Sequence, residues 1–208
     1  MAGSQVAESG RGELVQVLAA AACELCEGQS ADLAFGTRSG VSVPECLAMA
    51  EAKTGALLGT ACQLGALAAG ASPAAAAGYR GFGRQLGVAF QLVDDLLGIW
   101  GDPRVTGKPA GPDLASRKKS LPVVAALTSG TQAGTQLARL YRRGEDLDEH
   151  AVAHAAELVE AAGGRAWAQA EAGRRMGAAM DALAQARPAP TAADDLRVLA
   201  DLITRRDH

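Results

Sequence analysis

The stretch FQLVDDLLGIWGD, Phe90 to Asp102, places two adjacent carboxylates, Asp94 and Asp95, inside a long apolar run. Neighbouring residues of a helix point about 100° apart, so both side chains can flank a groove without neutralising each other. Burying unpaired carboxylates is costly, and a hard divalent cation such as Mg²⁺ removes that cost by binding their oxygens and bridging to phosphate groups. The pair therefore predicts a Mg²⁺ site, and the alternative is a solvated helix face.

The composition favours an all-α protein. The chain has 208 residues, which suits one domain with a sizeable core, and it is 49% hydrophobic but only 3% aromatic. Alanine and leucine dominate, and these residues favour helix over strand. The formal net charge of −3 gives no broad basic field, so no nucleic-acid partner is indicated.

Apolar periodicity and capping signals divide the chain into helices. Ser42 to Glu45 read as a capping box, and Ser72-Pro73 as the start of a further helix. Residues 1–12 are polar and are expected to be a disordered N-terminus, with residues 13–208 forming one helical domain. The expected helices cover residues 12–35, 42–70, 73–100, 118–127, 132–143, 148–162, 166–185 and 192–204.

The uncharged run over residues 54–79 raises the question of a membrane span. It consists largely of Ala, Gly and Leu and is interrupted by Ser72-Pro73, whereas a span needs a longer unbroken apolar stretch. We therefore expect a soluble protein without a membrane span.

Cys23 and Cys26 form a CxxC motif, but neither a second CxxC nor a nearby histidine accompanies it. Cysteines at this spacing in an alanine-rich helix are usually small core residues, and a metal or redox site is the alternative. No signal peptide pattern precedes Cys23, which favours a location in the reducing cytoplasm.

Basic residues accompany the carboxylate pair along the chain. Residues 101–113 are rich in glycine and proline and are expected to form a long loop that contains Lys108, with Lys118 and Lys119 just beyond it. Lys53 is the last charge before the uncharged run, which fits an ordinary surface lysine poorly. Carboxylates for a metal, lysines for phosphate and an apolar channel together predict a site for an apolar diphosphate.

Five short motifs carry a resemblance to a known family. They occur in the order GQSADL (28–33), KTGALL (53–58), GVAFQLVDDLLGIWGD (87–102), GKPAGPDL (107–114) and KKSLP (118–122). In this order the chain resembles the C-terminal two-thirds of the trans-isoprenyl diphosphate synthases, the polyprenyl synthetase family. The resemblance implies the isoprenoid synthase fold, a helical bundle around a central cavity, with the N-terminal helices missing.

The resemblance also implies a trans-prenyltransferase, in which an allylic diphosphate ionises with the help of Mg²⁺ and isopentenyl diphosphate attacks the cation. Asp94 would bind the metal directly and Asp95 largely through waters, and both would be catalytic together with Lys53. The implied substrate-binding residues are Lys53, Thr54, Gln91, Lys108 and Lys118.

Two departures from the family pattern bear on activity. The second aspartate-rich motif is usually DDxxD, but Gly98 stands at its last position and removes a carboxylate from the metal side, for which Asp102 could partly compensate. The first aspartate-rich motif and the basic residues for isopentenyl diphosphate would precede residue 1. We therefore expect this chain alone to be an incomplete catalyst, working as a homodimer or with a full-length synthase.

Two other functions remain open. The chain could be a non-catalytic partner subunit of a full-length prenyl diphosphate synthase, because an exposed apolar face would need a partner. It could also be a class I terpene cyclase-like enzyme, although the scarcity of aromatic residues speaks against a cavity that stabilises carbocations.

Overall fold

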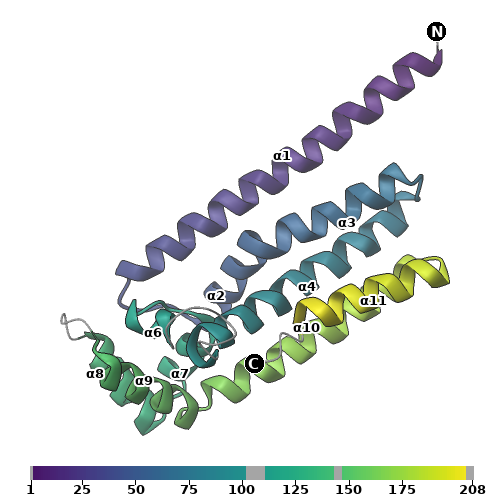
Figure 1. Ribbon diagram of the computed structural model, residues 1–208. Coiled ribbons are helices and arrows are strands. Elements are labelled where there is room, and N and C mark those ends of the chain that lie inside the picture. The colour runs from purple at the N-terminus through teal and green to yellow at the C-terminus, as the bar shows by residue number, and fades with distance from the viewer. Residues whose placement is uncertain (1, 102–110, 143–146, 205–208) are drawn as a thin grey trace.

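A computed structural model gives the fold and describes residues 2–101, 111–142 and 147–204. These residues form helices and short connections and contain no strand, which confirms the expected all-α class (Figure 1). In chain order the elements are α1 (Ala2–Thr37), α2 (Val43–Ala50), the π-helical η1 (Glu51–Gly55), α3 (Ala56–Ala68), α4 (Pro73–Trp100), α6 (Pro112–Ala115), α7 (Leu121–Leu127), α8 (Gln132–Arg142), α9 (Glu149–Ala161), α10 (Gly164–Ala186) and α11 (Pro190–Thr204).

The helix α4 is the centre of the molecule. It packs along α3 and α10 and also contacts η1, α6, α7 and α11. In Figure 1 the long helices run alongside one another, and the short helices from α6 to α9 gather at one end. The segment with Asp94 and Asp95 belongs to the last turns of α4, so it lies where the long helices meet the short ones.

Helix starts follow the capping signals of the sequence. The Ser42 backbone N–H donates to the Glu45 side chain at 2.9 Å, and the Glu45 N–H donates to the Ser42 hydroxyl at 3.4 Å, which completes the expected capping box. At the start of α4 the Ser72 hydroxyl accepts from the Ala75 N–H at 3.3 Å, as expected for an N-cap.

Several boundaries differ from the sequence prediction. Helix α1 begins at Ala2, so residues 2–12 are helical where disorder was expected. The expected helix over residues 42–70 is interrupted by η1, because its hydrogen bonds switch to π-helical spacing over five residues. Lys118 lies before α7 rather than in it, and the short α6 occupies part of the expected loop.

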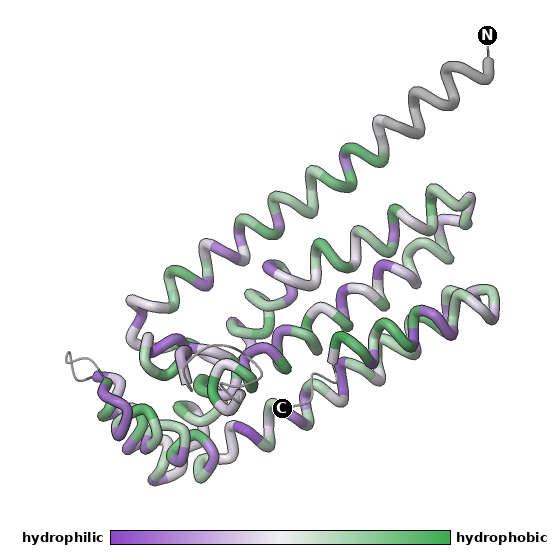
Figure 2. The backbone as a smooth tube through the Cα atoms, viewed as in Figure 1, coloured by the Kyte–Doolittle hydropathy of each residue, from purple (hydrophilic) through white to green (hydrophobic). Residues whose placement is uncertain are grey.

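The expected core position of the CxxC cysteines is wrong. Cys23 and Cys26 are both exposed on α1. Small size made them compatible with a core, but α1 is packed on one side only: Ala21 is buried and Glu24 pairs with Arg84 on that side, and the two cysteines lie outside it. Hydrophobic residues recur along α1 (Figure 2), and Val15, Leu18 and Leu33 are likewise exposed.

Glycines allow α4 to approach α3 and η1 with their backbones nearly in contact. A Cβ on Gly83 would clash with the carbonyl oxygen of Leu58 and lie 2.7 Å from the carbonyl carbon. One turn later, a Cβ on Gly87 would lie 2.7 Å from the Cα of Gly55. The i,i+4 glycine pair of α4 therefore presents a flat surface to the preceding helix.

No helix in the described part of the chain combines the length and hydropathy needed to cross a membrane.

We expect Gly83→Ala to lower the free energy of unfolding by about 1–3 kcal/mol, because the added methyl overpacks a backbone contact. Gly177→Ala is the matched control, since a Cβ at this exposed α10 position meets nothing within 4 Å. The control should raise stability by up to about 1 kcal/mol through helix propensity. Urea denaturation measures both, and equal effects in the two variants would contradict the close-packing explanation.

Candidate functional site

Asp95 is the most buried of the charged site residues in the described part of the chain, with 1% of its surface exposed. Its Oδ1 accepts from the Gln91 amide at 3.0 Å and from the Lys118 ammonium at 3.2 Å. Its Oδ2 accepts from the backbone N–H of Leu121 at 2.9 Å. The carboxylate thus joins α4 to the first turn of α7 and to Lys118 in the connection before α7.

The titration of Asp95 and Lys118 reflects this placement. Burial raises the pKa of the Asp95 carboxyl above its ordinary value, and Lys118, the Leu121 N–H and Gln91 oppose that rise without cancelling it. Burial lowers the pKa of Lys118, but the attraction of Asp95 and then of Asp113 outweighs it, so the pKa of Lys118 is raised. Lys118 therefore keeps its positive charge beside the carboxylate.

The chain of contacts continues from α4 to η1. The Thr54 hydroxyl donates to the Gln91 amide oxygen at 2.9 Å, and the Gln91 amide nitrogen in turn donates to Asp95. Thr54, Gln91, Asp95, Lys118 and the Leu121 N–H form one connected set, which we call the Asp95 network. It brings together four predicted site residues from three separate motifs.

Lys53 lies beside Thr54 on η1 and has a different partner. Its ammonium donates to the Asp32 carboxylate of α1 at 2.6 Å, with 27% of the Lys53 side chain exposed. The backbone of Lys53 presses against α1 at Gly28, where a Cβ would clash with the Lys53 N–H. Lys53 is consequently fixed by α1, through the contact at Gly28 and the ion pair with Asp32. Thr54 is fixed by α4, through its hydrogen bond to Gln91.

Asp94 is exposed, unlike its neighbour. Among the described residues no group of three or more His, Cys, Asp or Glu side chains is placed to hold a metal ion. Mg²⁺ often uses only one or two protein carboxylates and completes its shell with waters and substrate phosphates. The exposed Asp94 fits that mode as a direct ligand better than the enclosed Asp95 does.

The sequence predicted that Gly98 removes a carboxylate from this side of α4. In the structure the carboxylate of another residue, Asp113, lies next to Gly98. A Cβ built on Gly98 would lie 2.6 Å from Oδ2 of Asp113 and 2.7 Å from its Cγ. Asp113 also pairs with Lys118, at 3.1 Å. A carboxylate from α6 therefore lies against α4 at Gly98, while Asp102, the compensating residue suggested by the sequence, lies outside the described residues, as does Lys108.

The sequence reasoning missed two residues that the structure places at the site. Asp32 pairs with Lys53, and Asp113 pairs with Lys118. Both stand inside motifs quoted from the sequence, GQSADL and GKPAGPDL, so the motifs mark them as candidates, although the sequence does not show which lysine each one contacts.

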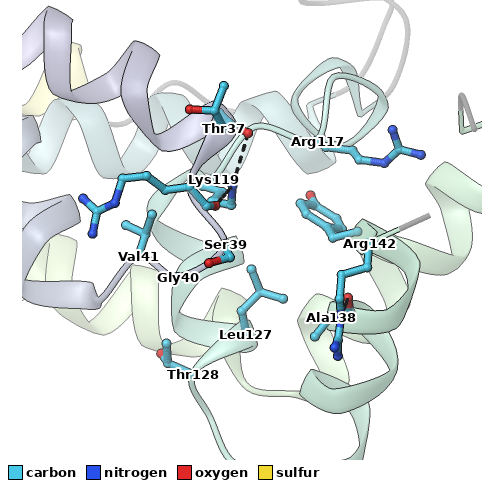
Figure 3. Close-up of a pocket in the computed structure, with 13 residues that line it drawn as sticks. Thr37, Ser39, Gly40, Val41, Arg117, Lys119, Leu127, Thr128, Ala138 and Arg142 are labelled. Atoms are coloured by element: carbon cyan, nitrogen blue, oxygen red, sulfur yellow. Dashed lines mark hydrogen bonds between the residues drawn. The ribbon is translucent and has the colours of Figure 1, made fainter. Parts of the chain in front are cut away.

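A separate cavity of about 510 Å³ lies beside the loop after α1. Figure 3 shows Ser39 and Gly40 on one side of it and Ala138 and Arg142 on the other. Lys119 is among the lining residues, but its ammonium donates to the carbonyl oxygens of Phe35 and Arg38 at 2.6 and 2.7 Å and so caps the end of α1. The described lining of this cavity includes no member of the Asp95 network.

Comparisons with known proteins identify relatives. The sequence model of polyprenyl synthetases matches residues 1–159. A geranylgeranyl diphosphate synthase of Mycobacterium tuberculosis is 49% identical over 184 residues, which cover 88% of this chain and 51% of that protein. The crystal structure of a polyprenyl synthetase from Streptomyces coelicolor matches with a TM-score of 0.88 and 42% identity, over 93% of this chain and 59% of that one.

A further structure, geranylgeranyl pyrophosphate synthase from Corynebacterium glutamicum complexed with isoprenyl diphosphate and magnesium, matches with a TM-score of 0.87 and 27% identity. The match covers 95% of this chain and 56% of that one. The chain thus spans about half the length of the curated relatives it matches.

We expect Asp95→Asn to lower the free energy of unfolding by about 3 kcal/mol, because the amide turns a donor toward the converging N–H groups and removes one of the two carboxylate partners of the partly buried Lys118 ammonium. Asp181→Asn, at an exposed position of α10, is the control and should change stability by less than about 0.5 kcal/mol. Chemical denaturation measures both. A small effect of Asp95→Asn would show that the Asp95 network does not hold α4 to α7.

Proposed function

Because the chain belongs to the polyprenyl synthetase family and has the helical isoprenoid synthase fold, we propose that it binds and activates the diphosphate of an allylic substrate. The reaction is the Mg²⁺-dependent transfer of the allylic group to isopentenyl diphosphate. The observation that carries the proposal is the Asp95 network, which joins the separate motifs around Thr54, Gln91 and Lys118 into one buried connection.

The lysines have donors left for a diphosphate. An ammonium has three N–H donors. Within the described part of the chain, Lys118 uses two of them, for Asp95 and Asp113, and Lys53 uses one for Asp32. The remaining donors can bind phosphate oxygens while the carboxylates keep each ammonium charged and oriented.

In the proposed reaction the allylic C–O bond breaks, the diphosphate leaves with the electron pair, and the double bond of isopentenyl diphosphate attacks the allylic cation before a proton is lost. Lys53 and Lys118 stabilise the charge that develops on the leaving diphosphate, which is the largest contribution available in such an ionisation. Asp94 would hold Mg²⁺, and the metal, when bound, neutralises further charge on the same oxygens. Thr54 and Gln91 orient the surrounding groups.

The test is prenyl transfer by the 208-residue chain, alone and mixed with a full-length synthase, with geranyl or farnesyl diphosphate, labelled isopentenyl diphosphate and Mg²⁺. We expect little product from the chain alone and, in the mixture, more of a longer allylic diphosphate than the full-length synthase forms by itself. Asp94→Asn should remove most of this gain through loss of the metal ligand. Asp181→Asn is the control. Diphosphate release from the allylic substrate without isopentenyl diphosphate would instead support the terpene cyclase-like function.

A second candidate function rests on α1. Val15, Leu18 and Leu33 are 65%, 51% and 71% exposed. Large apolar residues left exposed along one helix are candidates for contact with another chain. We propose that this face packs against a second polyprenyl synthetase chain, either a copy of this one or a full-length synthase whose product length it adjusts.

Light scattering, alone and after mixing with a full-length synthase, tests this second function. We expect a dimer or a heteromer, and Leu18→Glu should weaken its association by roughly tenfold or more because a charge replaces a buried apolar contact. Leu57→Glu, on the partly exposed surface of α3, is the comparison. A stable monomer under all conditions would exclude the partner-subunit function.

A further inference from the structure

The cavity of about 510 Å³ beside the loop after α1 has a basic lining. Arg38, Arg117, Lys119 and Arg142 belong to it, and none of the described lining residues is acidic. The volume lies within the range of small-molecule sites. Positive charges that no carboxylate of the same lining balances attract anions into the cavity.

Two of the four cations are engaged by the protein itself. The Lys119 ammonium donates to main-chain carbonyl oxygens at the end of α1, and the Arg38 guanidinium pairs with Glu45 at 2.6 Å. The cations of this lining that suit an anionic ligand are therefore Arg117 and Arg142.

Arg142 and the loop after α1 offer hydrogen-bond donors on different sides of the cavity (Figure 3). Within the described residues, Arg142 donates only through Nε, to the Ala138 carbonyl at 3.1 Å, which leaves both of its Nη groups. The backbone N–H groups of Ser39 and Gly40 donate to no other described residue. An anionic group between them can accept from a guanidinium on one side and from main-chain N–H groups on the other.

The backbone of Arg117 has a left-handed conformation. Its φ is +52°, a region that is unfavourable for a residue with a side chain and is readily adopted by glycine. Stability of the fold alone would therefore favour glycine at position 117. An unfavourable backbone that nevertheless carries a long basic side chain, here in the lining of a cavity, points to a function of that side chain.

The rest of the lining indicates an organic ligand rather than a bare ion. Val41, Leu127 and Ala138 contribute apolar side chains, and the cavity is larger than a phosphate group alone would fill. The hydroxyl of Tyr141, another lining residue, is buried and has no hydrogen-bond partner among the described residues. Buried polar groups are normally hydrogen-bonded, so this hydroxyl is an unused hydrogen-bonding group beside the cavity.

We propose that this cavity binds a small organic phosphate, at a site separate from the predicted diphosphate site. The phosphate oxygens bind Arg117, Arg142 and the N–H groups of the loop after α1, and the organic part lies against the apolar side chains. Guanidinium groups suit this role because two of their N–H groups can bind two oxygens of one phosphate. The described lining shares no residue with the Asp95 network, so the inference does not rest on the proposed function.

The test is calorimetric titration of the 208-residue chain in EDTA, without Mg²⁺, with phenyl phosphate, inorganic phosphate and phenol as probes. We expect phenyl phosphate to bind, inorganic phosphate to bind about tenfold more weakly because it lacks the apolar part, and phenol not to bind because it lacks the charge. No binding of phenyl phosphate, or equal binding of inorganic phosphate, would overturn the proposed ligand class.

Variants locate the bound phosphate. R142Q should weaken phenyl phosphate binding by roughly tenfold or more through loss of charge-assisted hydrogen bonds. R139Q is the matched control, because Arg139 is an exposed residue of the same helix outside the described lining, and it should bind as the wild type does. If K53M removes binding and R142Q does not, the phosphate occupies the predicted diphosphate site and the inference is wrong.

R117G separates a binding role of Arg117 from a structural one. The substitution removes the guanidinium but suits the left-handed backbone, so the midpoint of thermal unfolding should stay the same or rise. Phenyl phosphate binding should nevertheless weaken by roughly tenfold or more. Unchanged binding would overturn the assignment of Arg117 to the site, whatever the midpoint.

Discussion

The burial of one carboxylate, that of Asp95, is the constraint on which the site depends. A carboxylate that is removed from water is destabilised unless hydrogen-bond donors of the protein replace the lost water molecules. Gln91 supplies one donor from the same helix, Lys118 a charged one from the connection before α7, and Leu121 the free N–H of the first turn of α7. Asp95 can therefore be buried only when α4, the connection before α7 and the first turn of α7 pack together. The same packing positions the predicted diphosphate-binding residues Gln91 and Lys118.

The two adjacent carboxylates of α4, Asp94 and Asp95, have different surroundings. Asp95 is enclosed and accepts hydrogen bonds from the protein, whereas Asp94, one residue and about 100° away, is exposed. In the proposed function the enclosed carboxylate would orient Lys118 and the exposed one would bind the cation. The surroundings of the two side chains differ because α4 turns one toward α7 and the other toward the surface.

Much of this arrangement could be predicted from the sequence. Composition and capping signals predicted the helical class and the starts of α2 and α4, and motif order predicted the family. The contacts of Asp113 and Asp32 could not be derived in this way, because they depend on how α6 and α1 pack against α4 and η1. Likewise, small size alone could not distinguish the buried Cys46 of α2 from the exposed Cys23 of α1, since burial depends on which side of each helix meets a neighbour.

The π-helical turn η1 lies between two close backbone contacts at glycines. Gly28 of α1 and Gly87 of α4 bring two helices against the backbone of η1, from the Lys53 and Gly55 sides. A π-helical turn widens the helix and shifts the register of the residues after it. Here it lets Lys53 pair with α1 while Thr54, its neighbour, bonds Gln91 of α4. The direction of these two side chains is consequently set by backbone contacts at glycines, so a methyl group added at Gly28 would displace Lys53 without touching any charged group.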